Sequence, residues 1–462
     1  MELQEFSKEE KQHLQKIAME HVIAHAASNE DLAKGPKVIT AGEGCYVYDI
    51  DGNKYLDSFS SLITSIFGHG RPEMKQAVME QMDRLAFFPN YQDSFTVPML
   101  QLAEKLAEIM PGDLEVSFFL NSGSEANETA LKMARQYHWT NGEPHRYKVI
   151  ARKGSYHGTT LGVTSYTGIP SLRECVEPLM PGAVFVEPVD FYNYGSGLDK
   201  ESYGLGCLKA LEETIEWEKP NTISAMIMDP IPGSNSGYPI PPDGYLQGVR
   251  ELCDKNGILL LFDEIQIGFG KTGKWFACEN WDVTPDFMAV SKAITAGYLP
   301  LAVMTTTKKI ADVFNKKPGS EFRSISTYGG HPVSCAVALA TIDIMEKEKV
   351  VEQAATTGKY LQAELEKLYQ YRIVGNVSGM GMIWAIDLVA DRDTNTKFGP
   401  KQKVGTFIRD WCWDHGMILR NNENMLVIAP ALVMTREEVD IMLGQLNEVI
   451  PIAMSRFGGD AT

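Results

Sequence analysis

The chain has 462 residues, of which 44% are hydrophobic and 22% charged, the proportions of a globular protein. This composition excludes a disordered or fibrous chain, and at about 150 residues per domain the length allows two or three domains. The formal net charge is −17, which argues against a general binder of nucleic acid or of anionic membranes, because such proteins are basic.

The seven cysteines are scattered and odd in number, and none has the spacing of a zinc site. This usage favours a reducing compartment. The opening segment, MELQEFSKEEKQHLQK, has no apolar signal core, and no apolar run reaches the roughly 20 residues of a membrane span. We therefore expect a cytoplasmic protein with no metal site and no membrane or nucleic-acid partner.

The first predicted elements are a helix and a hairpin. Charged and apolar residues alternate at helical spacing over residues 7–28. Residues 45–57 contain two β-rich runs around Asp51-Gly52, which is typical of a hairpin turn.

A long central section then alternates short apolar runs with helical patterns, such as those at 124–138 and 244–256. The runs barely alternate in polarity, as expected for strands buried on both faces of a mostly parallel sheet. They cover residues 116–121, 147–151, 183–189, 223–229, 258–264, 287–292 and 301–307. The pattern predicts an α/β fold with seven central strands.

Beyond about residue 340 the pattern changes to a smaller α+β unit. Helices are expected at 350–371, 402–415 and 435–454, and strands at 381–389 and near 417–429. We divide the chain into an N-terminal segment that belongs to the small domain (1–65), a large domain (66–340) and a C-terminal small domain (341–462).

Three polar features follow predicted buried strands, where open α/β sheets bind ligands. The first is Ser122-Gly123-Ser124, directly before a helix. Free backbone N–H groups and the helix dipole at such a turn suit a phosphate, and the hydroxyls add donors. An ordinary helix cap explains the same residues.

The other two features are Asp263, at the end of ILLLFDE, and Lys292, after DFMAVS. Alone, Asp263 is explained by a turn cap and Lys292 by a side chain that reaches solvent. A desolvated lysine is instead nucleophilic toward carbonyls. Together, a phosphate-binding turn, a carboxylate and a nucleophilic lysine are the groups that pyridoxal 5′-phosphate (PLP) requires.

Longer stretches carry a family resemblance. They are NSGSEANETALKMAR (121–135), GSYHGTT (154–160), LLLFDEIQIGFGKTGKWFA (259–277), SKAITAGYLPLAV (291–303), STYGGHPVSCAVA (326–338) and LVIAPALVMTREEVD (426–440). With them the sequence resembles the class-III aminotransferases of PLP fold type I, and most of all their ω-amine:pyruvate branch. The resemblance runs from about residue 40 to the C-terminus. It implies an aspartate aminotransferase-like large domain with a mostly parallel seven-stranded sheet, and a small α+β domain built from both chain ends.

The resemblance also implies roles for residues around the cofactor. Lys292 matches the lysine that bonds to the cofactor and shuttles a proton during catalysis. Asp263 matches the partner of the protonated pyridine nitrogen. Ser122, Gly123 and Ser124 match the phosphate site. Tyr156 matches the aromatic residue stacked on the ring, and His157 accompanies it as a cofactor contact.

Four further positions are carried over in the same way. Gln266 corresponds to a residue beside the ring. Thr327 matches a threonine that reaches the phosphate from the other subunit, which implies a homodimer, or a dimer of dimers, with shared active sites. Arg420 matches a mobile arginine that binds a keto-acid carboxylate and moves away for substrates without one. Ile63 stands where many relatives have a tryptophan lining the substrate pocket.

Plainer explanations stay open for several of these residues. Tyr156 and His157 are also explained by core packing, Thr327 by a cap before a helix, and Arg420 by a surface position at a strand end. The sequence also departs from the family pattern. The usual EPxxGxGG stretch begins with Asp229 and contains an inserted proline, and the usual GFGRTG has Lys271.

The resemblance therefore implies a PLP-dependent aminotransferase that moves the amino group of a primary amine or ω-amino acid to a keto acid, most readily pyruvate, to give L-alanine. Taurine, β-alanine, a polyamine and aryl-alkyl amines are the candidate donors. Two alternatives remain: a PLP-dependent aminomutase or racemase, and a non-catalytic protein with the same fold. Arg420, Lys292 and Asp263 favour transamination, because an isomerase needs no keto acid and a relic tends to lose the lysine or aspartate.

Overall fold

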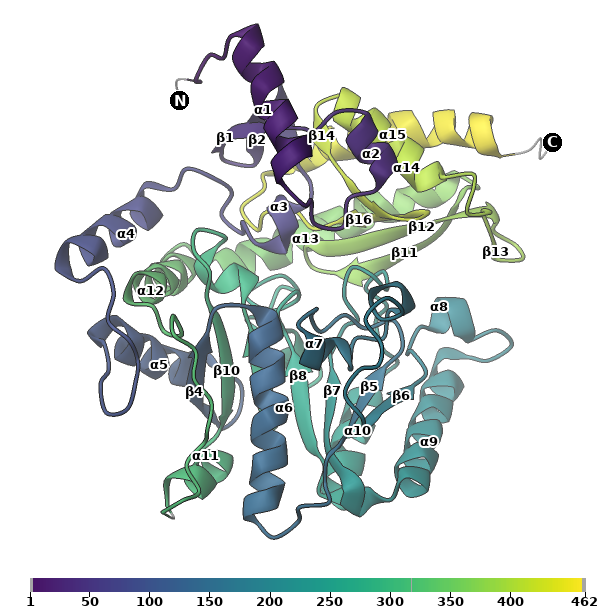
Figure 1. The fold of residues 1–462 in the computed structure, drawn as a ribbon. Helices are drawn as coiled ribbons and strands as arrows, with labels where there is room; N and C mark the ends of the chain where they lie inside the picture. Colours follow the sequence, from purple (N-terminus) through teal and green to yellow (C-terminus); the bar gives the residue numbers. More distant parts are fainter. Residues whose placement is uncertain (1–2, 317, 459–462) are drawn as a thin grey trace.

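A computed structural model describes residues 3–316 and 318–458. In Figure 1 the chain forms a large lower part built around one sheet and a smaller upper part that contains both termini. The described residues form sheets of seven, five and four strands, the five-stranded one including a short two-residue strand at its margin.

The seven-stranded sheet has the order β4-β10-β9-β8-β7-β5-β6. Pairing is parallel from β9 through β6, whereas β10 is antiparallel to both of its neighbours. Its strands are β4 (Leu114–Leu120), β5 (Lys148–Arg152), β6 (Ala183–Val186), β7 (Ile223–Met228), β8 (Leu259–Asp263), β9 (Phe287–Val290) and β10 (Ala302–Thr307). All seven strands predicted from apolar runs are confirmed, as is the mostly parallel sheet.

Helices cover both faces of this sheet, which explains why its strands are apolar on both sides. Leu259 and Leu261 of β8 pack in the cluster that includes α6 (Gly123–Thr140) and α11 (Lys308–Asn315). Leu260 and Phe262 point to the other face. That face is covered by α5 (Val97–Ile109), α9 (Lys200–Glu218), α10 (Tyr245–Asn256) and α12 (Pro332–Lys347).

The smaller part joins the two ends of the chain. Its four-stranded sheet contains β1 (Ile39–Glu43), β2 (Tyr46–Asp49), β3 (Lys54–Asp57) and β14 (Met417–Ile418). Strand β14 pairs in parallel with β3, so residues 360 positions apart are neighbours. The predicted hairpin is therefore confirmed as β2–β3, and the prediction that both chain ends build the small α+β unit is confirmed as well. Strand β1, which is short and exposed, was not predicted from the sequence pattern.

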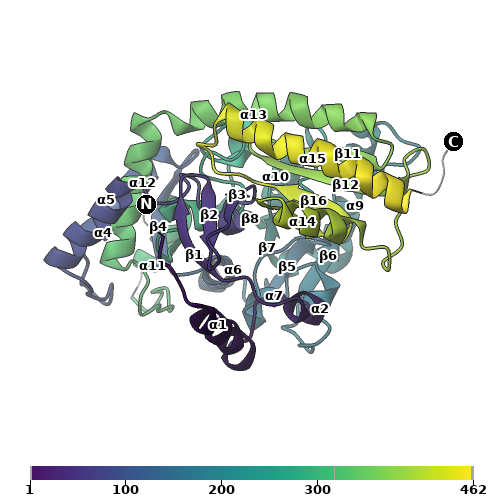
Figure 2. The same cartoon turned by 90° about the horizontal axis from the view of Figure 1, so that it is seen from above.

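The five-stranded sheet consists of β11 (Val374–Met380), β12 (Ile383–Asp391), β16 (Met425–Ile428) and β15 (Arg420–Asn422), with β13 (Thr396–Lys397) paired to β12. Helices α13 (Val350–Glu366) and α15 (Arg436–Phe457) run beside one another across it, as Figure 2 shows from above. Helix α14 (Val404–Asp414) leads into β14 and, two residues later, into β15.

The remaining helical elements are short or lie at the periphery. They are α1 (Lys8–His21), α2 (Asn29–Ala33), α3 (Ser60–Ile63), α4 (Pro72–Arg84), α7 (Leu161–Thr164), α8 (Phe191–Tyr194), and the 3₁₀ segments η1 (Pro170–Leu172), η2 (Pro220–Thr222), η3 (Ala277–Asn280), η4 (Lys292–Thr295) and η5 (Lys367–Gln370). The first predicted helix ends at His21, earlier than expected, because no residue of α1 is buried and packing does not extend it. Within the described residues, no helix is both long and apolar enough to cross a membrane.

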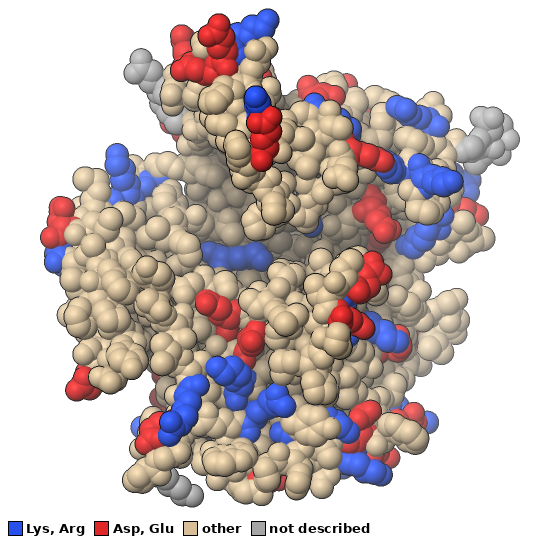
Figure 3. Space-filling view, viewed as in Figure 1, with Lys and Arg blue, Asp and Glu red and all other residues tan. Residues whose placement is uncertain are grey.

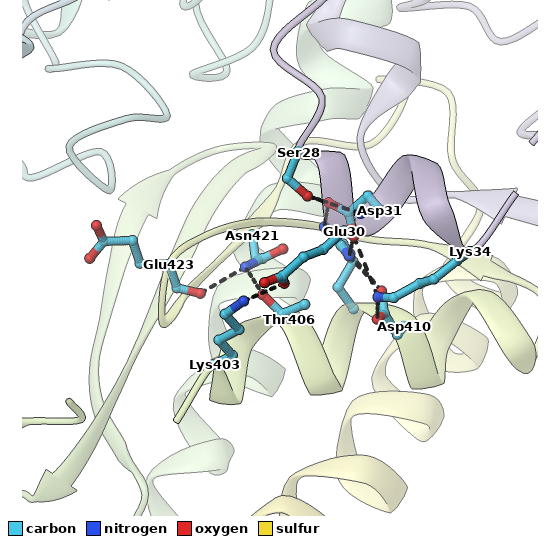
Figure 4. Close-up of polar contacts among 10 residues, drawn as sticks. Ser28, Glu30, Asp31, Lys34, Lys403, Thr406, Asp410, Asn421 and Glu423 are labelled. Atoms are coloured by element: carbon cyan, nitrogen blue, oxygen red, sulfur yellow. Dashed lines mark hydrogen bonds and ion pairs between the residues drawn. The ribbon is translucent and has the colours of Figure 1, made fainter. Parts of the chain in front are cut away.

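Ion pairs fasten the N-terminal segment to α14 (Figure 4). The Asp31 carboxylate lies 2.6 Å from the Arg409 guanidinium, and Lys34 Nζ lies 2.6 Å from the Asp410 carboxylate. Glu30 pairs with Lys403 at the start of the same helix. The Arg409 guanidinium holds the pKa of Asp31 at about 2, well below its usual value. Helix α2 is thereby held against α14, the helix that precedes β14 and β15.

Candidate active site

The predicted site residues meet at the carboxyl edge of the seven-stranded sheet, where ligands bind in folds of this class. One cavity lies there, between the ends of β4, β5, β7, β8 and β9. It is lined by Gly123, Ser124, Tyr156, His157, Gly158, Asp229, Ile231, Asp263, Ile265, Gln266, Ile267, Ser291 and Lys292. The structure thus brings together seven of the residues singled out in the sequence: Gly123, Ser124, Tyr156, His157, Asp263, Gln266 and Lys292.

The carboxylate of Asp263 is buried and firmly held. One oxygen lies 2.9 Å from Nδ1 of His157 and accepts a hydrogen bond of 2.7 Å from the Asn127 side chain, while the other accepts from the Ile265 N–H. The Asp263 side chain is only 7% exposed. Charge-assisted bonds of this kind fix the orientation of a carboxylate in a site with little water.

Asn127 is a part of the site that the sequence analysis missed. It lies in α6, one turn after Gly123, and is fully buried. Its amide also donates to the His157 carbonyl, so it joins the α6, β5 and β8 contributions to the cavity. A buried polar residue within an alanine-rich helical turn was the available signal, because such residues are buried only with partners.

The turn before α6 forms a close-packed cradle. Ser122 accepts from the Glu125 N–H, and Glu125 reaches back to the N–H groups of Asn121 and Ser122. Gly123 and Ser124 line the cavity, whereas Ser122 is the cap of the helix and does not line it. The cap explanation therefore holds for Ser122, and the two following residues present the helix N-terminus to the cavity.

Glycine is required at two positions of this cradle. A Cβ at Gly123 would lie 2.6 Å from the Ile265 side chain, and one at Gly158 would lie 2.3 Å from Ser124 Oγ. Gly158 also has a φ of +134°, which L-residues with a side chain rarely adopt. A side chain at either position would clash with its neighbours, so only glycine lets the backbone approach the cavity this closely.

Lys292 begins η4 directly after β9, with a φ of +49°. Burial lowers the pKa of its ammonium, Asp263 opposes that shift, and Arg420 adds to it. Because the neutral amine is the nucleophilic form, this environment prepares Lys292 for attack on a carbonyl.

Asp229, which replaces the usual glutamate, forms a buried ion pair of 2.5 Å with Arg152. It also accepts from Ser155 Oγ and the Gly233 N–H. Gln266 accepts from the Ser234 N–H in the same turn. The aspartate at position 229 therefore links the ends of β5 and β7 and stabilises this wall of the cavity.

Besides Ser122, three predicted residues do not line this cavity. Ile63 is buried in the core, with 2% of its surface exposed. Thr327 is exposed on the segment before α12, which is tied to Asn121 through Ser326. Arg420 lies in β15 and lines a neighbouring groove of about 1000 Å³ together with Arg152, Ser236 and Asn422.

That groove separates the two parts of the molecule. Figure 3 shows a hollow between the part that carries the N-terminal helix and the part built on the large sheet, with basic side chains inside it. Within the described chain Arg420 has no carboxylate partner, and its one hydrogen bond, of 3.3 Å, goes to Asn422. A half-buried cation without a counter-ion suits an anionic ligand.

A second lysine is buried beside the site and was not singled out as functional. Lys271 is 2% exposed, and its Nζ has no hydrogen-bond partner among the residues that the structure covers. Burial, reinforced by Lys292, lowers the pKa of Lys271 to about 7. Burial also raises the pKa of nearby Glu264 to about 7, although Glu264 accepts from the N–H groups of Ala277 and Cys278.

The residues of the cavity fit PLP. A glycine-lined helix N-terminus suits a phosphate, an anchored carboxylate suits a protonated ring nitrogen, and a desolvated lysine suits an aldehyde. His157 Nε2 and Asn127 Oδ1 are buried without partners, so this wall has additional polar capacity.

Comparisons with known proteins agree with this chemistry. The sequence model of the aminotransferase class-III family matches residues 27–450. The chain is 36% identical over 411 residues to putrescine–pyruvate aminotransferase of Pseudomonas aeruginosa, with 89% of each protein covered.

Solved structures are similar over nearly the whole chain. A thermostable (S)-enantioselective ω-transaminase from Thermomicrobium roseum superposes with a TM-score of 0.93 and 37% identity, covering 96% of this chain and 99% of the other. An ω-transaminase from Pseudomonas jessenii in complex with PMP gives 0.93 and 30%, with the same coverage.

Replacing Lys271 by methionine should stabilise the protein. The folded-state pKa of about 7 lies below the ordinary 10.5, so folding must strip the Lys271 ammonium of its proton or bury it charged. This cost is present in full below pH 7 and disappears as the pH rises toward 10.5. We expect Lys271→Met to raise the free energy of unfolding by roughly 2–4 kcal/mol at pH 7 and by much less near pH 10. Urea unfolding at the two pH values measures this.

Lys209→Met, at an exposed position of α9, is the matched control and should change stability little at either pH. An equal gain for Lys271→Met at pH 7 and pH 10 would show that packing, not the buried charge, sets the difference.

Proposed function

Because this chain belongs to the class-III aminotransferases, which are PLP-dependent enzymes, we propose that it transfers the amino group of a primary amine or ω-amino acid to pyruvate, giving L-alanine. The observation that carries the proposal is Arg420, which is half-buried and has no counter-ion among the described residues. Arg420 lowers the pKa of Lys292, whereas Asp263 raises it. Such an arginine binds the carboxylate of a keto acid. Among the candidate donors, a polyamine has the support of the putrescine-using relative, and taurine, β-alanine and aryl-alkyl amines remain alternatives.

Bound PLP supplies an aldehyde that takes up the amino group and a ring that delocalises the electrons released when the donor carbon loses a proton. Lys292 Nζ is the group that carries this proton, because burial lowers its pKa and so favours the neutral amine that can accept a proton. Asp263, held by Asn127 and His157, keeps a proton on the ring nitrogen. Gly123 and Ser124 would hold the phosphate, with Tyr156 and Gln266 beside the ring.

The same residues complete both halves of the reaction. Lys292 Nζ returns the proton when pyruvate accepts the nitrogen, so one base serves donor and acceptor in turn. With an amine donor that has no carboxylate, Arg420 binds a carboxylate in the second half only. This requirement for a keto acid favours transamination over an aminomutase or racemase.

A homodimer completes the proposed site. Large apolar side chains are exposed along α4, the segment 85–97, the start of α5 and the segment before α12, where Phe87 stacks on Tyr328, the neighbour of Thr327. They are Met79, Met82, Leu85, Phe87, Phe88, Tyr91, Phe95, Val97, Leu100, Ile325 and Tyr328. An exposed patch of this size is typical of a subunit interface. Thr327 then reaches the phosphate of the other subunit.

We propose the cytoplasm as its location, because all seven cysteines are free thiols and five of them are buried.

Replacing Lys292 by alanine should abolish transamination while leaving the fold intact, since the substitution removes a buried amine that forms no hydrogen bond in the described structure. We expect kcat to fall by at least about a thousandfold. The measurement is L-alanine formation from pyruvate with each candidate donor, one at a time. Retention of substantial transamination in a correctly folded Lys292→Ala protein would contradict the assignment.

Replacing Arg420 by alanine should act on one half-reaction only. We expect the KM for pyruvate to rise at least about tenfold, because a charge-assisted contact to the carboxylate is lost. The half-reaction with an aryl-alkyl amine that carries no carboxylate should change less than about twofold. Single-turnover kinetics with each substrate separate the two, and an equal loss in both would exclude Arg420 as the carboxylate site.

Mixing two inactive variants should test the shared site. In a dimer of one Lys292→Ala subunit and one Thr327→Glu subunit, one of the two sites contains Lys292 and Thr327 intact. Mixed and reassembled subunits should therefore recover up to roughly a quarter of wild-type activity, whereas each variant alone stays inactive. No recovery, despite hybrid dimers detected by mass spectrometry, would place Thr327 outside the partner's site.

A further inference from the structure

The segment that follows β3 has an unusual backbone. Ser60, Ser61 and Ile63 have φ values of +40°, +64° and +61°. Residues with side chains rarely adopt this region, and a β-branched residue such as Ile63 is a clear outlier there. A backbone of this kind persists only where the surrounding structure enforces it, and such segments cluster at functional sites.

The carboxylate of Asp57 enforces it. Asp57 is 3% exposed at the end of β3. Its Oδ1 accepts from the Phe59 N–H at 3.0 Å, and its Oδ2 accepts from the Ser61 N–H at 2.5 Å and faces Ser61 Oγ at 3.4 Å. The anion therefore holds the two N–H groups that bracket the turn, so the positive φ values are fixed by charge-assisted bonds.

The same segment is bound to the strands on either side of Arg420. The N–H and Oγ of Ser58 both donate to the Ile418 carbonyl, in β14. The Ala429 N–H donates to the Ser58 carbonyl, and Ser60 Oγ donates to the Ala429 carbonyl, directly after β16. Strand β15, which carries Arg420, follows β14 in the sequence and pairs with β16 in the sheet. Residues 57–60 are therefore attached to both strands that position Arg420.

This attachment places an aromatic ring against the guanidinium of Arg420. The guanidinium carbon lies 5.3 Å from the centre of the Phe59 ring, within the range of a cation–π contact. The guanidinium has one hydrogen bond to a described residue, the 3.3 Å bond to Asn422, and Arg420 Nε is buried without a partner. With so few polar contacts, the Phe59 ring is a surface against which the guanidinium is held in place.

We propose that Asp57 is a positioning residue for keto-acid binding: it holds the strained turn that places Phe59 against Arg420. This inference rests on the proposed function of Arg420. It deepens that function by assigning the orientation of the carboxylate-binding arginine to a buried acid that itself touches neither substrate nor cofactor.

The test compares the cofactor-loaded Asp57→Asn enzyme with the wild type. The amide keeps the size of the side chain but turns one acceptor into a donor that faces a backbone N–H. We expect the KM for pyruvate to rise about tenfold with kcat little changed, and the half-reaction with an aryl-alkyl amine to stay within about twofold. Equilibrium binding of propanoate, a carboxylate that cannot react, should weaken by a similar factor.

Two further variants separate positioning from general damage. In Asp57→Asn/Ser61→Gly, glycine adopts the positive φ of residue 61 without strain, so pyruvate and propanoate binding should recover most of the loss. Phe59→Leu removes the ring at the cost of a small loss of buried volume, and should reproduce the effect of Asp57→Asn without altering the turn.

Asp49→Asn is the matched control. Asp49 accepts from the N–H groups of Asp51 and Asn53 and from Tyr55 Oη in the same sheet as Asp57, but it lies at the hairpin turn between β2 and β3, whereas Arg420 belongs to the five-stranded sheet. It should lower thermal stability as Asp57→Asn does, without changing the KM for pyruvate.

The outcomes are distinguishable. If Arg420→Ala weakens pyruvate binding selectively but Asp57→Asn does not, the positioning role is wrong and the proposed function stands. If Arg420→Ala itself has no selective effect, the proposed function of Arg420 fails first. If Asp57→Asn and Asp49→Asn lower both half-reactions alike, Asp57 has only a structural role.

Discussion

The architecture of the site depends on the buried carboxylate of Asp263, which requires hydrogen-bond partners inside the protein. Asp263 ends a strand covered on both faces, so its charge must be satisfied within the protein. Asn127 from α6 and His157 from the end of β5 provide the partners. These bonds tie three separate strand–helix units together at one edge of the sheet. The positions of the Gly123-Ser124 turn and of Tyr156 around the cavity follow from that arrangement.

Three basic side chains in and beside the cleft are not fully compensated by nearby negative charge. Lys271 has no hydrogen-bond partner and Arg420 no carboxylate partner within the described chain, and Lys292 loses basicity by burial. The net charge of the whole protein is −17, so this small basic region stands out against the acidic balance of the chain. Burying these cations costs energy, as does the positive-φ backbone at residues 60, 61 and 63, and the surrounding packing must offset both costs.

Much of the large domain is readable from the sequence, because strands buried on both faces produce uninterrupted apolar runs. All seven runs became strands of one sheet, and the polar residues that follow them met at its carboxyl edge. Ser122-Gly123-Ser124, Asp263 and Lys292 were therefore identifiable as neighbours. The family motifs added Tyr156, His157 and Gln266, whose side chains carry no periodic signal of their own.

Other features required contacts between distant parts of the chain. Asn127 gave only a weak local signal, a polar residue in an alanine-rich helical turn, and Lys271 gave none that indicates burial. The importance of both depends on the residues that surround them in the folded protein. The pairing of β3 with β14 joins segments about 360 residues apart, and no local pattern encodes such a partner choice.

The sequence by itself determined the class of fold, the positions of the central strands and helices along the chain, and the chemical groups of the cofactor site. These features depend on local periodicity and short motifs. Only the tertiary structure decided which strands are neighbours, how Phe59 comes to lie against Arg420, and that Ile63 and Thr327 stay outside the cofactor cavity of their own chain. Those features depend on burial and on hydrogen bonds between remote segments, and these exist only once the two chain ends have folded against each other.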